Sequence, residues 1–354
     1  MSDPSVKTKY LILGQGLAGT LLSFRLSKLG IEHIVMDRGH EGASSNVAAG
    51  IVNPVTGRRF VKAWRIDLLT PGLRIYKELE QLLGIHLLNE ITVYRDLSEI
   101  SALNQWDMRR SDTAYTPFMG RPQSELEVPI RVPRLVGPTL QAAQVNLREL
   151  ITSYRSLLLS KKKLVEVEHS VDDAFFSNGY WHIGGFAARK IIDCTGSTAM
   201  QTSTWAKLPW RGTKGEALRF SLTEMPRNLA IKMRHFICPI GNTNEVWLGG
   251  TNQDHFVDNA PSTDAEAKLA AQAVAFEIAL PKQREHLVAI RPTVKDRRPL
   301  VGEHPEKPGL WICNGFGTKG TSLGPFCTEQ LANALLIGDT LDVEIDIKNR
   351  FCTD

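Results

Sequence analysis

The stretch that decides the fold reads Tyr10-Leu11-Ile12-Leu13-Gly14-Gln15-Gly16-Leu17-Ala18-Gly19. A short apolar strand runs into three glycines, and apolar residues at helical spacing continue to a stop at Gly30. In a strand–turn–helix unit of this kind, the first glycine permits the tight turn and the second lets backbone approach a phosphate. The third lets the helix pack closely on its strand. The helix N-terminus adds free N–H groups and a positive dipole end. The stretch therefore predicts an α/β domain that binds a dinucleotide pyrophosphate.

The next apolar strand supports this prediction. It covers residues 32–36 and ends at Asp37, roughly 20 residues after the glycines, where an acidic side chain binds ribose hydroxyls in such domains. We expect Asp37 to contact the ribose and include its neighbour Arg38 among the candidate cofactor contacts.

Length and composition exclude several classes of protein. The chain has 354 residues, which is long enough for two domains or one large interleaved unit. Its net charge is +4, and its hydrophobic and charged fractions are ordinary for a globular protein. Its basic pairs lack interleaved aromatic residues and indicate solvated surface rather than a nucleic-acid face. No apolar run approaches the ~18 residues of a membrane span, and the apolar N-terminal segment is broken by glycines, unlike a signal peptide. We expect a soluble, cytoplasmic protein with no nucleic-acid partner.

The cysteines predict neither disulfides nor a metal site. They are odd in number and widely spaced, with no CxxC pair, at Cys194, Cys238, Cys313, Cys327 and Cys352. Reduced thiols and no bound metal are expected.

Glycine, proline and helix-capping residues indicate where helices and turns begin and end in the rest of the chain. Thr70 and Pro71 predict the start of a helix that ends at Gly84. Over residues 85–134 the pattern changes to short strand-like segments with several prolines, which indicates an inserted domain. A further helix is expected from Gly137 through Tyr154. Asn178-Gly179 predicts a hairpin turn.

The later part of the chain predicts more strands and two helices. Residues 190–193 have the pattern of a buried parallel strand, and alternating strands follow from about residue 209. Thr263 and Glu266 predict a capping box for a helix reaching about residue 280. A helix is expected to start at Pro325. Overall we predict a discontinuous nucleotide-binding domain of residues 1–84, 135–208 and 291–354. The substrate domain, residues 85–134 and 209–290, is expected to have a mixed, largely antiparallel sheet.

Further segments carry a resemblance to a known family. They are Ala43–Ile51 (ASSNVAAGI), Ile192–Ser197 (IDCTGS), His235–Pro239 with Trp247–Thr251, Ile290–Gly302 (IRPTVKDRRPLVG) and Asn314–Pro325 (NGFGTKGTSLGP). With the glycine turn, they resemble in order the D-amino-acid-oxidase family of FAD-dependent oxidoreductases. That family includes glycine oxidase and the oxidase domain of the bifunctional tRNA wobble-uridine modification enzyme. The resemblance implies a Rossmann-like FAD-binding domain with an inserted substrate domain.

The resemblance also implies which residues contact FAD. A serine, Ser44 or Ser45, would donate to the pyrophosphate, and small residues after it would let backbone lie against the isoalloxazine ring. The backbone of Val165 would meet the adenine edge. The full set of implied contacts is Gly14, Gly16, Leu17, Ala18, Gly19, Asp37, Arg38, Ser44, Ser45, Ala49, Gly50, Ile51, Val165, Thr195, Gly196, Gly315, Gly317, Thr318, Lys319, Gly320 and Thr321.

Four residues are implied for the substrate and the reaction. Arg291 would pair with a substrate carboxylate through two parallel N–H···O bonds. His235 and Phe236 are candidates to line the pocket, and a core role for His235 is the alternative. Lys319 would add positive charge where reduced flavin becomes negative. The chain departs from the family at Ile240, where a basic residue is common, and at Val288-Ala289, where Trp-Gly is usual.

The sequence thus predicts a hydride transfer from the carbon bearing an amine to FAD, followed by hydrolysis of the imine. The substrate would be a small amino acid or secondary amine. Arg58, Arg59 and Lys62 follow the Asn53-Pro54 turn and either contact an acidic substrate or lie on solvated surface. The alternatives are a dehydrogenase serving a quinone or carrier protein, a tRNA-modifying oxidase, and a non-catalytic flavin-binding sensor. The electron acceptor, O2 or another, stays open.

Overall fold

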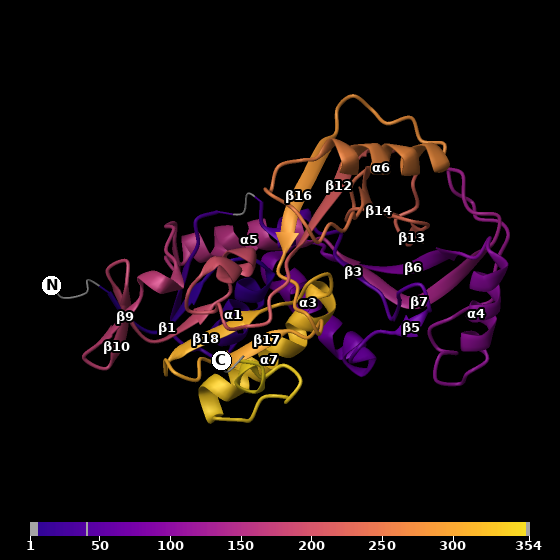
Figure 1. The fold of residues 1–354 in the computed structure, drawn as a ribbon. Helices are drawn as coiled ribbons and strands as arrows, with labels where there is room; N and C mark the ends of the chain where they lie inside the picture. The colour runs from indigo at the N-terminus through magenta and orange to yellow at the C-terminus, as the bar shows by residue number, and fades with distance from the viewer. Residues whose placement is uncertain (1–5, 40–41, 352–354) are drawn as a thin grey trace. The chain divides into compact units, whose positions relative to one another are not determined.

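The computed structural model describes residues 6–39 and 42–351, so Cys352 lies outside the described residues. The chain divides into two compact units, each built from separated stretches (Figure 1). Unit 1 comprises residues 1–46, 148–213 and 290–354, and unit 2 comprises residues 47–147 and 214–289. Two predicted boundaries need correction, because residues 47–84 and 135–147 belong to unit 2. The reason is strand pairing: residues 51–52 and 88–96 both pair with residues 136–145.

Unit 1 contains helices and a mixed sheet whose central strands are parallel. Its elements are β1 (Val6–Leu13), α1 (Leu17–Lys28), β2 (His33–Met36), α5 (Leu147–Ser160), β8 (Leu164–Val165), η2 (Val171–Asp173), β9 (Phe175–Ser177), β10 (Tyr180–Ile183), β11 (Phe186–Asp193), η3 (Gly196–Gln201), β17 (Leu300–Glu303), β18 (Leu310–Asn314), α7 (Gly320–Ile337) and η4 (Ile347–Asn349). The short helix α2 (Ser44–Val47) ends at the boundary of the unit.

The order of strands in unit 1 is that of a doubly wound fold. The main path runs β17-β18-β11-β1-β2-β8, and β1 is parallel to β11 and β2 on its two sides. β18 is also parallel to β11, and β17 returns antiparallel to it. Fully buried residues of β1 and β11, such as Leu11 and Ile191, pack into one core with Trp205 and Leu300. The predicted Rossmann-like fold is confirmed.

Unit 2 contains a second, mixed sheet. Its elements are β3 (Ile51–Val52), β4 (Val55–Thr56), β5 (Val61–Lys62), η1 (Ile66–Leu68), α3 (Leu69–Leu83), β6 (Leu88–Asp96), α4 (Ile100–Arg110), β7 (Val136–Val145), β12 (Thr213–Ser221), β13 (Leu229–Lys232), β14 (Phe236–Pro239), β15 (Glu245–Gly249), α6 (Thr263–Ala275) and β16 (Glu285–Arg291). The strand order is β16-β12-β15-β14-β13-β6-β7-β3.

The pairing in this sheet is largely antiparallel, as the sequence predicts. β12, β15, β14 and β13 pair antiparallel in turn, as do β6, β7 and β3. The exception is β13, which runs parallel to β6 with Lys232 opposite Arg95. Because side chains of paired residues share a face, this register places those two cations side by side.

The two faces of the unit 2 sheet differ. On one face Leu269 and Ala273 of α6, with Phe276 just after it, pack against strand residues such as Ile231 and Ile237 (Figure 1). The opposite face carries a cluster of mostly small residues, named here the Ala49 cluster. Its members are Ala49, Ile91, Val93, Ala142, Ala217, Ala230, Cys238, Ile240 and Trp247, with Ile51, Phe236 and Leu287 packed against them.

Three predicted helix starts need correction. α3 begins at Leu69, so Thr70 is not its N-cap, although Gly84 ends it with φ +66° as expected. Ser262, not Thr263, caps α6, because the Ser262 side chain accepts from the N–H of Ala265. α6 also ends earlier, at Ala275. α7 begins at Gly320, five residues before Pro325.

The predicted helix from Gly137 to Tyr154 is wrong in its first half. Residues 136–145 form β7, and α5 begins only at Leu147. The physical reason is tertiary: β7 lies between β6 and β3 and gains ladder hydrogen bonds on both sides, which override local preference. Helix α4, within residues 85–134, was not predicted at all.

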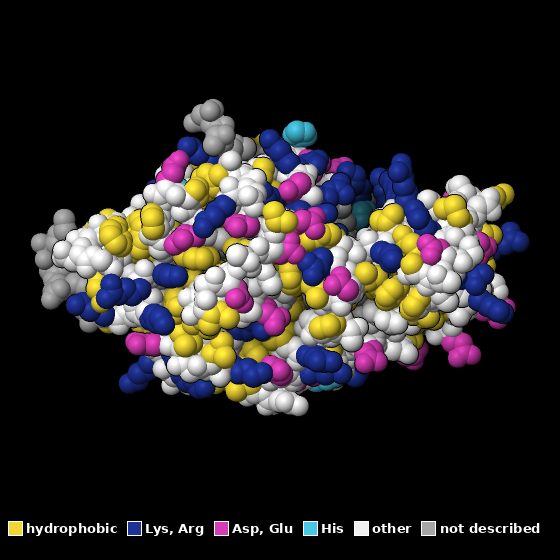
Figure 2. Space-filling model, turned by 90° about the horizontal axis from the view of Figure 1, so that it is seen from below, with side chains coloured by type: hydrophobic (Ala, Val, Ile, Leu, Met, Phe, Trp, Pro, Cys, Tyr) yellow, Lys and Arg dark blue, Asp and Glu magenta, His cyan; other side chains and the backbone are white. Residues whose placement is uncertain are grey.

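No helix within residues 6–39 and 42–351 is long and apolar enough to cross a membrane. Over the same ranges, no three His, Cys, Asp or Glu side chains come together as a metal would require. The cysteines at 194, 238, 313 and 327 are buried. Figure 2 shows a face on which Lys and Arg side chains stand among Asp and Glu side chains.

Candidate functional site

The glycine turn after β1 has the geometry that its sequence predicts. Gly14 has φ +90°, and a Cβ there would lie 2.7 Å from the carbonyl oxygen of Cys194. A Cβ on Gly19 would lie 1.9 Å from the carbonyl oxygen of Gly14. Neither position can carry a side chain without moving backbone. Gly16 differs, because its φ is −69° and its nearest neighbour, Ser45 Oγ, would lie 3.4 Å from an added Cβ.

The N-terminus of α1 carries no negative charge. Its first turn contains no acidic residue, and the N-cap Gly16 has no side chain to cap it. Ser45 Oγ accepts a hydrogen bond of 3.1 Å from the N–H of Leu17. Of the two candidate serines, Ser45 is therefore the one that contacts this helix end.

Asp37 closes the same end of the sheet. Its Oδ2 accepts from the N–H of Gln15 at 2.7 Å, which links the acid directly to the glycine turn. Its Oδ1 accepts from Gly39 at 2.8 Å and from Nη1 of Arg155 at 2.7 Å. Arg155 comes from α5 and its Nη2 also donates to Glu166 at 2.8 Å. Sequence reasoning missed Arg155, because nothing in the local pattern of α5 marks it.

Two other candidate cofactor residues, Arg38 and Val165, form contacts within the protein. Arg38 pairs with Glu168, and the side chains of both are more than half exposed. The carbonyl of Val165 accepts from the N–H of Asp37 at 3.1 Å, which aligns β8 with β2. Val165 thus lies beside the candidate ribose-binding acid, while Arg38 points to a surface partner.

The turn after β11 lies beside the glycine turn. Asp193 is fully buried, and its Oδ1 accepts from both the N–H and the hydroxyl of Thr195, at 2.9 and 2.6 Å. Its Oδ2 accepts from the indole N–H of Trp205 at 2.9 Å. Burial raises the pKa of Asp193. Asn314 at the end of β18 donates to the carbonyl of Gly196 at 2.9 Å, which ties this turn to the next loop.

That next loop leads into α7. Gly315 and Gly317 have φ +75° and +55°, and the N–H of Gly317 donates to the carbonyl of Pro292 at 3.1 Å. Lys319 is the N-cap residue of α7, and the first turn of this 18-residue helix contains no acid. Burial, together with the nearby charges of Arg298 and Arg297, lowers the pKa of Lys319. The corrected start of α7 places its positive end at the candidates Lys319, Gly320 and Thr321, with the exposed Thr318 just before it.

Arg291 ends β16. Burial lowers its pKa to about 10, and its carbonyl accepts from the N–H of Thr293 at 2.8 Å. A guanidinium removed from water in this way gains strongly from a carboxylate partner.

In unit 2 the segment containing Ala49, Gly50 and Ile51 is fixed to β7. Gly50 has φ +71°, and a Cβ there would lie 1.9 Å from the carbonyl oxygen of Val145. The carbonyl of Ala49 accepts from the side chain of Gln144 at 3.0 Å. The carbonyl of Val47 accepts from the indole N–H of Trp247 at 2.9 Å. Close backbone packing explains this glycine without reference to a cofactor.

His235 and Phe236 have different surroundings. Phe236 packs on the Ala49 cluster. The backbone N–H of His235 donates to Gln272 of α6, and its Nδ1 lies 3.2 Å from the carbonyl oxygen of Gly250. Burial lowers the pKa of His235 and so favours its neutral form. Its Nε2 is sealed from solvent and has no hydrogen-bond partner among the described residues. The core alternative for His235 agrees with these contacts.

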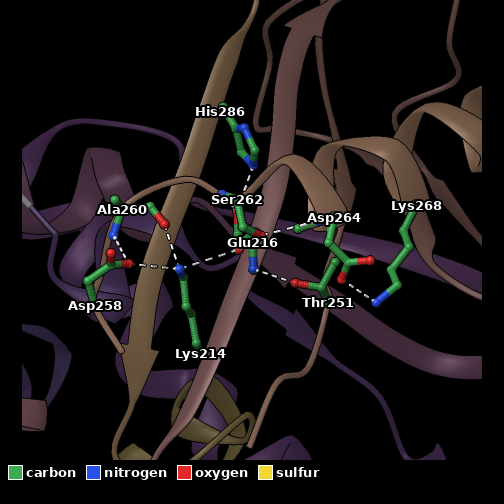
Figure 3. A network of polar contacts seen from close by, with 10 residues as sticks. Lys214, Glu216, Thr251, Asp258, Ala260, Ser262, Asp264, Lys268 and His286 are labelled. Carbon is green, nitrogen blue, oxygen red and sulfur yellow. Dashed lines mark hydrogen bonds and ion pairs between the residues drawn. The ribbon is translucent and has the colours of Figure 1, made fainter. Parts of the chain in front are cut away.

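A buried polar network that sequence reasoning missed holds the loop before α6 (Figure 3). Glu216 on β12 is 1% exposed and accepts from the N–H and hydroxyl of Ser262, at 2.9 and 2.7 Å. Its carboxylate also lies 3.7 Å from Nζ of Lys214 and 2.8 Å from Nε2 of His286. Lys214 further donates to the carbonyl of Ala260. Since every partner belongs to the sheet or to this loop, the network is structural.

A family model described as FAD dependent oxidoreductase (DAO) matches residues 9–334. The chain belongs to the DAO family of FAD-dependent oxidoreductases. Its cofactor is FAD, and the family resemblance seen in the sequence is confirmed.

Relatives and solved structures agree with this assignment. The chain is 25% identical to the uncharacterized oxidoreductase YurR of Bacillus subtilis, over 95% of this chain and 96% of that protein. It is 23% identical to the bifunctional tRNA-modifying protein MnmC of Caulobacter and covers 55% of its length. Glycine oxidase from Geobacillus kaustophilus matches with a TM-score of 0.80 at 18% identity, over 99% of this chain and 100% of that one. Iminodiacetate oxidase from Chelativorans matches with a TM-score of 0.74 at 21% identity, over 95% and 97%.

The residues of unit 1 fit FAD. Two helix N-termini lack acidic residues, Gly14 and Gly19 leave the strand–helix turn free of side chains, and the anchored carboxylate of Asp37 lies beside that turn. These features supply N–H donors for a pyrophosphate and an acceptor for a ribose.

Proposed function

We propose that this protein oxidises the C–N bond of a small amino acid or secondary amine. FAD supplies the hydride-accepting ring. The observation that carries the proposal is the N-terminus of α7, where a helix dipole and the Lys319 cation occur together after the Gly315–Gly317 loop. Positive charge held in place there stabilises the negative charge that reduction creates.

The residues of unit 1 would hold the cofactor. The α1 N-terminus and Ser45 would bind the pyrophosphate, Asp37 the ribose, and the turn at Thr195-Gly196 would support the ring system. The substrate would lose a hydride from the carbon and a proton from the nitrogen, which leaves a C=N bond. Water then adds to that bond and releases the amine from the new carbonyl compound.

Arg291 would bind the substrate carboxylate. A guanidinium can donate two parallel hydrogen bonds to one carboxylate, which fix orientation as well as adding binding energy. No side-chain base is required if the amine binds in its neutral form. The names of the neighbours support the substrate class, since those proteins are described as acting on glycine and iminodiacetate.

The purified protein would be tested first for its flavin spectrum and then for anaerobic bleaching with amino acids and N-methyl amines. Bleaching by any amine supports the proposal, and resistance to all of them favours a non-catalytic sensor. An oxygen electrode separates an oxidase from a dehydrogenase that uses another acceptor. RNA binding at low salt would favour a tRNA-modifying oxidase instead. Arg291→Lys is expected to weaken binding of a carboxylate substrate; unchanged affinity would refute its role.

A further inference from the structure

One face of the unit 1 sheet carries aromatic rings beside cations. The pairing of four adjacent strands places Phe175 of β9, His182 of β10, Ala187 of β11 and Lys7 of β1 in one row. Because side chains of paired residues share a face, Phe175 and Lys7 point to the same side of the sheet. The rings of Phe175 and His182 are stacked, with centroids 5.0 Å apart and 12° between their planes. The β9–β10 hairpin lies at the edge of unit 1, beside the start of β1 (Figure 1).

Tyr180 joins the stacked rings to the cations. It lies two residues before His182 and therefore on the same face of β10. Its ring centre is 4.1 Å from Cζ of Arg189 and 5.6 Å from Nζ of Lys7. Lys9, two residues after Lys7, points to the same face from β1. The set named here the Phe175 face comprises Lys7, Lys9, Phe175, Tyr180, His182 and Arg189.

The Phe175 face is exposed. The side chain of Phe175 is 47% exposed, and the three cations of the face are exposed as well. Single exposed apolar residues are common on protein surfaces. Here the exposed ring belongs to a cluster rimmed by charge, which is typical of a surface that binds a protein or a membrane.

The cations of this face are not neutralised within the described part of the chain. Among residues 6–39 and 42–351, no carboxylate lies within 4.0 Å of the charged groups of Lys7, Lys9 or Arg189. Arg189 donates one hydrogen bond, to the carbonyl of Gly179 at 3.2 Å. The Phe175 face therefore has a local excess of positive charge.

The two acids just before β9 have other partners. The carboxylate of Asp172 accepts from the N–H groups of Ser203 and Thr204, at 2.7 and 2.9 Å. The carboxylate of Asp173 accepts from the N–H of Ser170 at 2.8 Å. Both acids thus hold local turns and connections instead of the cations of the Phe175 face.

We infer that the Phe175 face binds the surface of a lipid bilayer that contains anionic headgroups. Exposed Lys and Arg side chains are attracted to the negative charge of such a surface. The polar edges of Tyr180 and His182 suit the headgroup layer, and Phe175 adds apolar area that would be buried beneath it. The face extends over three interstrand spacings, about 14 Å, so a broad planar surface can meet all of its members at once.

This binding site is separate from the cofactor site and from the proposed substrate. Lys7 and Lys9 lie in the first half of β1, whereas the glycine turn follows the end of that strand, so the two sites are at opposite ends of β1. The inference bears on the electron acceptor, because a quinone acceptor would be dissolved in the bilayer. It needs no particular amine as substrate.

The test uses the holoprotein and vesicles of phosphatidylcholine, with and without phosphatidylglycerol. Cosedimentation at low salt is expected to show binding only to the vesicles with phosphatidylglycerol, and added salt should weaken it by screening the charges. Lys7→Gln and Arg189→Gln should each lower the partition coefficient about fivefold, the effect of one cation near an anionic surface. The flavin spectrum of each variant verifies that it is folded.

Phe175 and Phe176 provide a matched pair, because adjacent residues of a strand point to opposite faces. Phe176 is 58% exposed, and its ring centre lies 5.4 Å from that of Trp181, a member of the unit 1 core. Phe175→Gln should lower the partition coefficient about tenfold, whereas Phe176→Gln should change it less than about twofold. Equal losses in the two variants would show that exposed rings adsorb without regard to face, and would overturn the inference.

Lys77→Gln is the control for charge. Lys77 is an exposed cation on α3 of unit 2, and no carboxylate of the described residues lies within 4.0 Å of it. This variant should bind the vesicles as the unmodified protein does.

Two further outcomes would refute a lipid partner. One is a protein that binds neither kind of vesicle, or both kinds equally. The other is binding to heparin without binding to vesicles, which would assign the cations to a soluble polyanion. Because no amine is present in these measurements, their result is independent of the test of the proposed function.

Discussion

Nη1 of Arg155 lies 2.7 Å from Oδ1 of Asp37, and both side chains are almost fully buried, at 12% and 10% exposure. The bond fixes the carboxylate whose other oxygen accepts from Gln15 in the glycine turn. Arg155 therefore orients the acid that is predicted to bind the ribose. We expect Arg155→Gln to weaken FAD binding about tenfold, as loss of a charge-assisted hydrogen bond does. Fluorescence titration of apoprotein with FAD measures this.

Glu166→Gln provides the control for that prediction. Glu166 is the second, more exposed partner of Arg155, and its Oε1 lies 2.8 Å from Nη2 of Arg155. The substitution should change FAD affinity by less than about threefold, because exposed ion pairs contribute little. Equal effects of the two variants would show that Arg155 does not act through Asp37.

The two adjacent serines provide a matched pair. Ser45 Oγ accepts from the N–H of Leu17 at the start of α1, whereas Ser44 begins the short helix α2. Ser45→Ala is expected to raise the Kd for FAD by about three- to tenfold, the value of a hydrogen bond to the pyrophosphate. Ser44→Ala should leave it unchanged. The reverse order would assign the phosphate contact to Ser44.

The sequence predicted the backbone of the cofactor site better than its side chains. Gly14 and Gly19 follow from sequence, because the tight turn needs φ +90° at Gly14 and a Cβ on Gly19 would meet the carbonyl of Gly14, five residues earlier. Arg155 does not, since it meets Asp37 across 118 residues and no short motif records the contact. Folding brings such pairs together through packing that a linear pattern does not contain.

The errors in secondary structure have the same origin. Residues 136–145 have the composition for a helix start. They form a strand because they pair with β6 on one side and with β3 on the other. In α7 the sequence marks Pro325 as a helix start, but the helix continues back to Gly320, where Gly320 and Gly324 pack near Leu17 and Leu21 of α1. Close helix packing thus decides where α7 begins.

His33 predicts a pH-dependent stability. It is 1% exposed, its Nε2 lies 2.8 Å from Ser23 Oγ, and burial lowers its pKa to about 4. In the unfolded chain the pKa is about 6.5. Below about pH 6.5 the unfolded state takes up a proton at His33 that the folded state does not. The contribution of neutral His33 to the free energy of unfolding is therefore full above about pH 6.5 and decreases toward pH 4. The loss is about 3 kcal/mol.

Urea denaturation between pH 7 and pH 4.5 tests this prediction. His33→Gln keeps polar groups near Ser23 but cannot take up a proton in this range. Its free energy of unfolding should fall less steeply over that range than that of the unmodified protein. Parallel curves for the two proteins would exclude His33 as the source of the acid sensitivity.

The Glu216 network predicts a large effect on stability. Glu216→Gln removes the buried carboxylate beside Lys214, which is 4% exposed, and leaves it paired with the exposed carboxylate of Asp258, 3.4 Å away. Removal of one member of a buried ion pair costs about 3–5 kcal/mol. Arg131→Gln, which breaks an exposed pair with Glu277, should cost less than about 1 kcal/mol. Denaturation at pH 7 measures the loss in free energy of unfolding for Glu216→Gln and for Arg131→Gln. Similar losses for the two variants would mean that the buried charges are solvated.

Lys319 should influence the reduction potential of FAD. It is the N-cap residue of α7, where its ammonium adds to the positive field of the helix N-terminus. Burial and, less strongly, the charges of Arg298 and Arg297 lower its pKa. If that field stabilises reduced flavin, Lys319→Gln should shift the midpoint potential negative by about 30 mV, which corresponds to about 1.4 kcal/mol for two electrons. Lys319→Arg should keep the potential. Thr318→Ala, one residue earlier and exposed, is the control. A potential unchanged in Lys319→Gln would leave the helix dipole as the source of the stabilisation and remove Lys319 from the reaction.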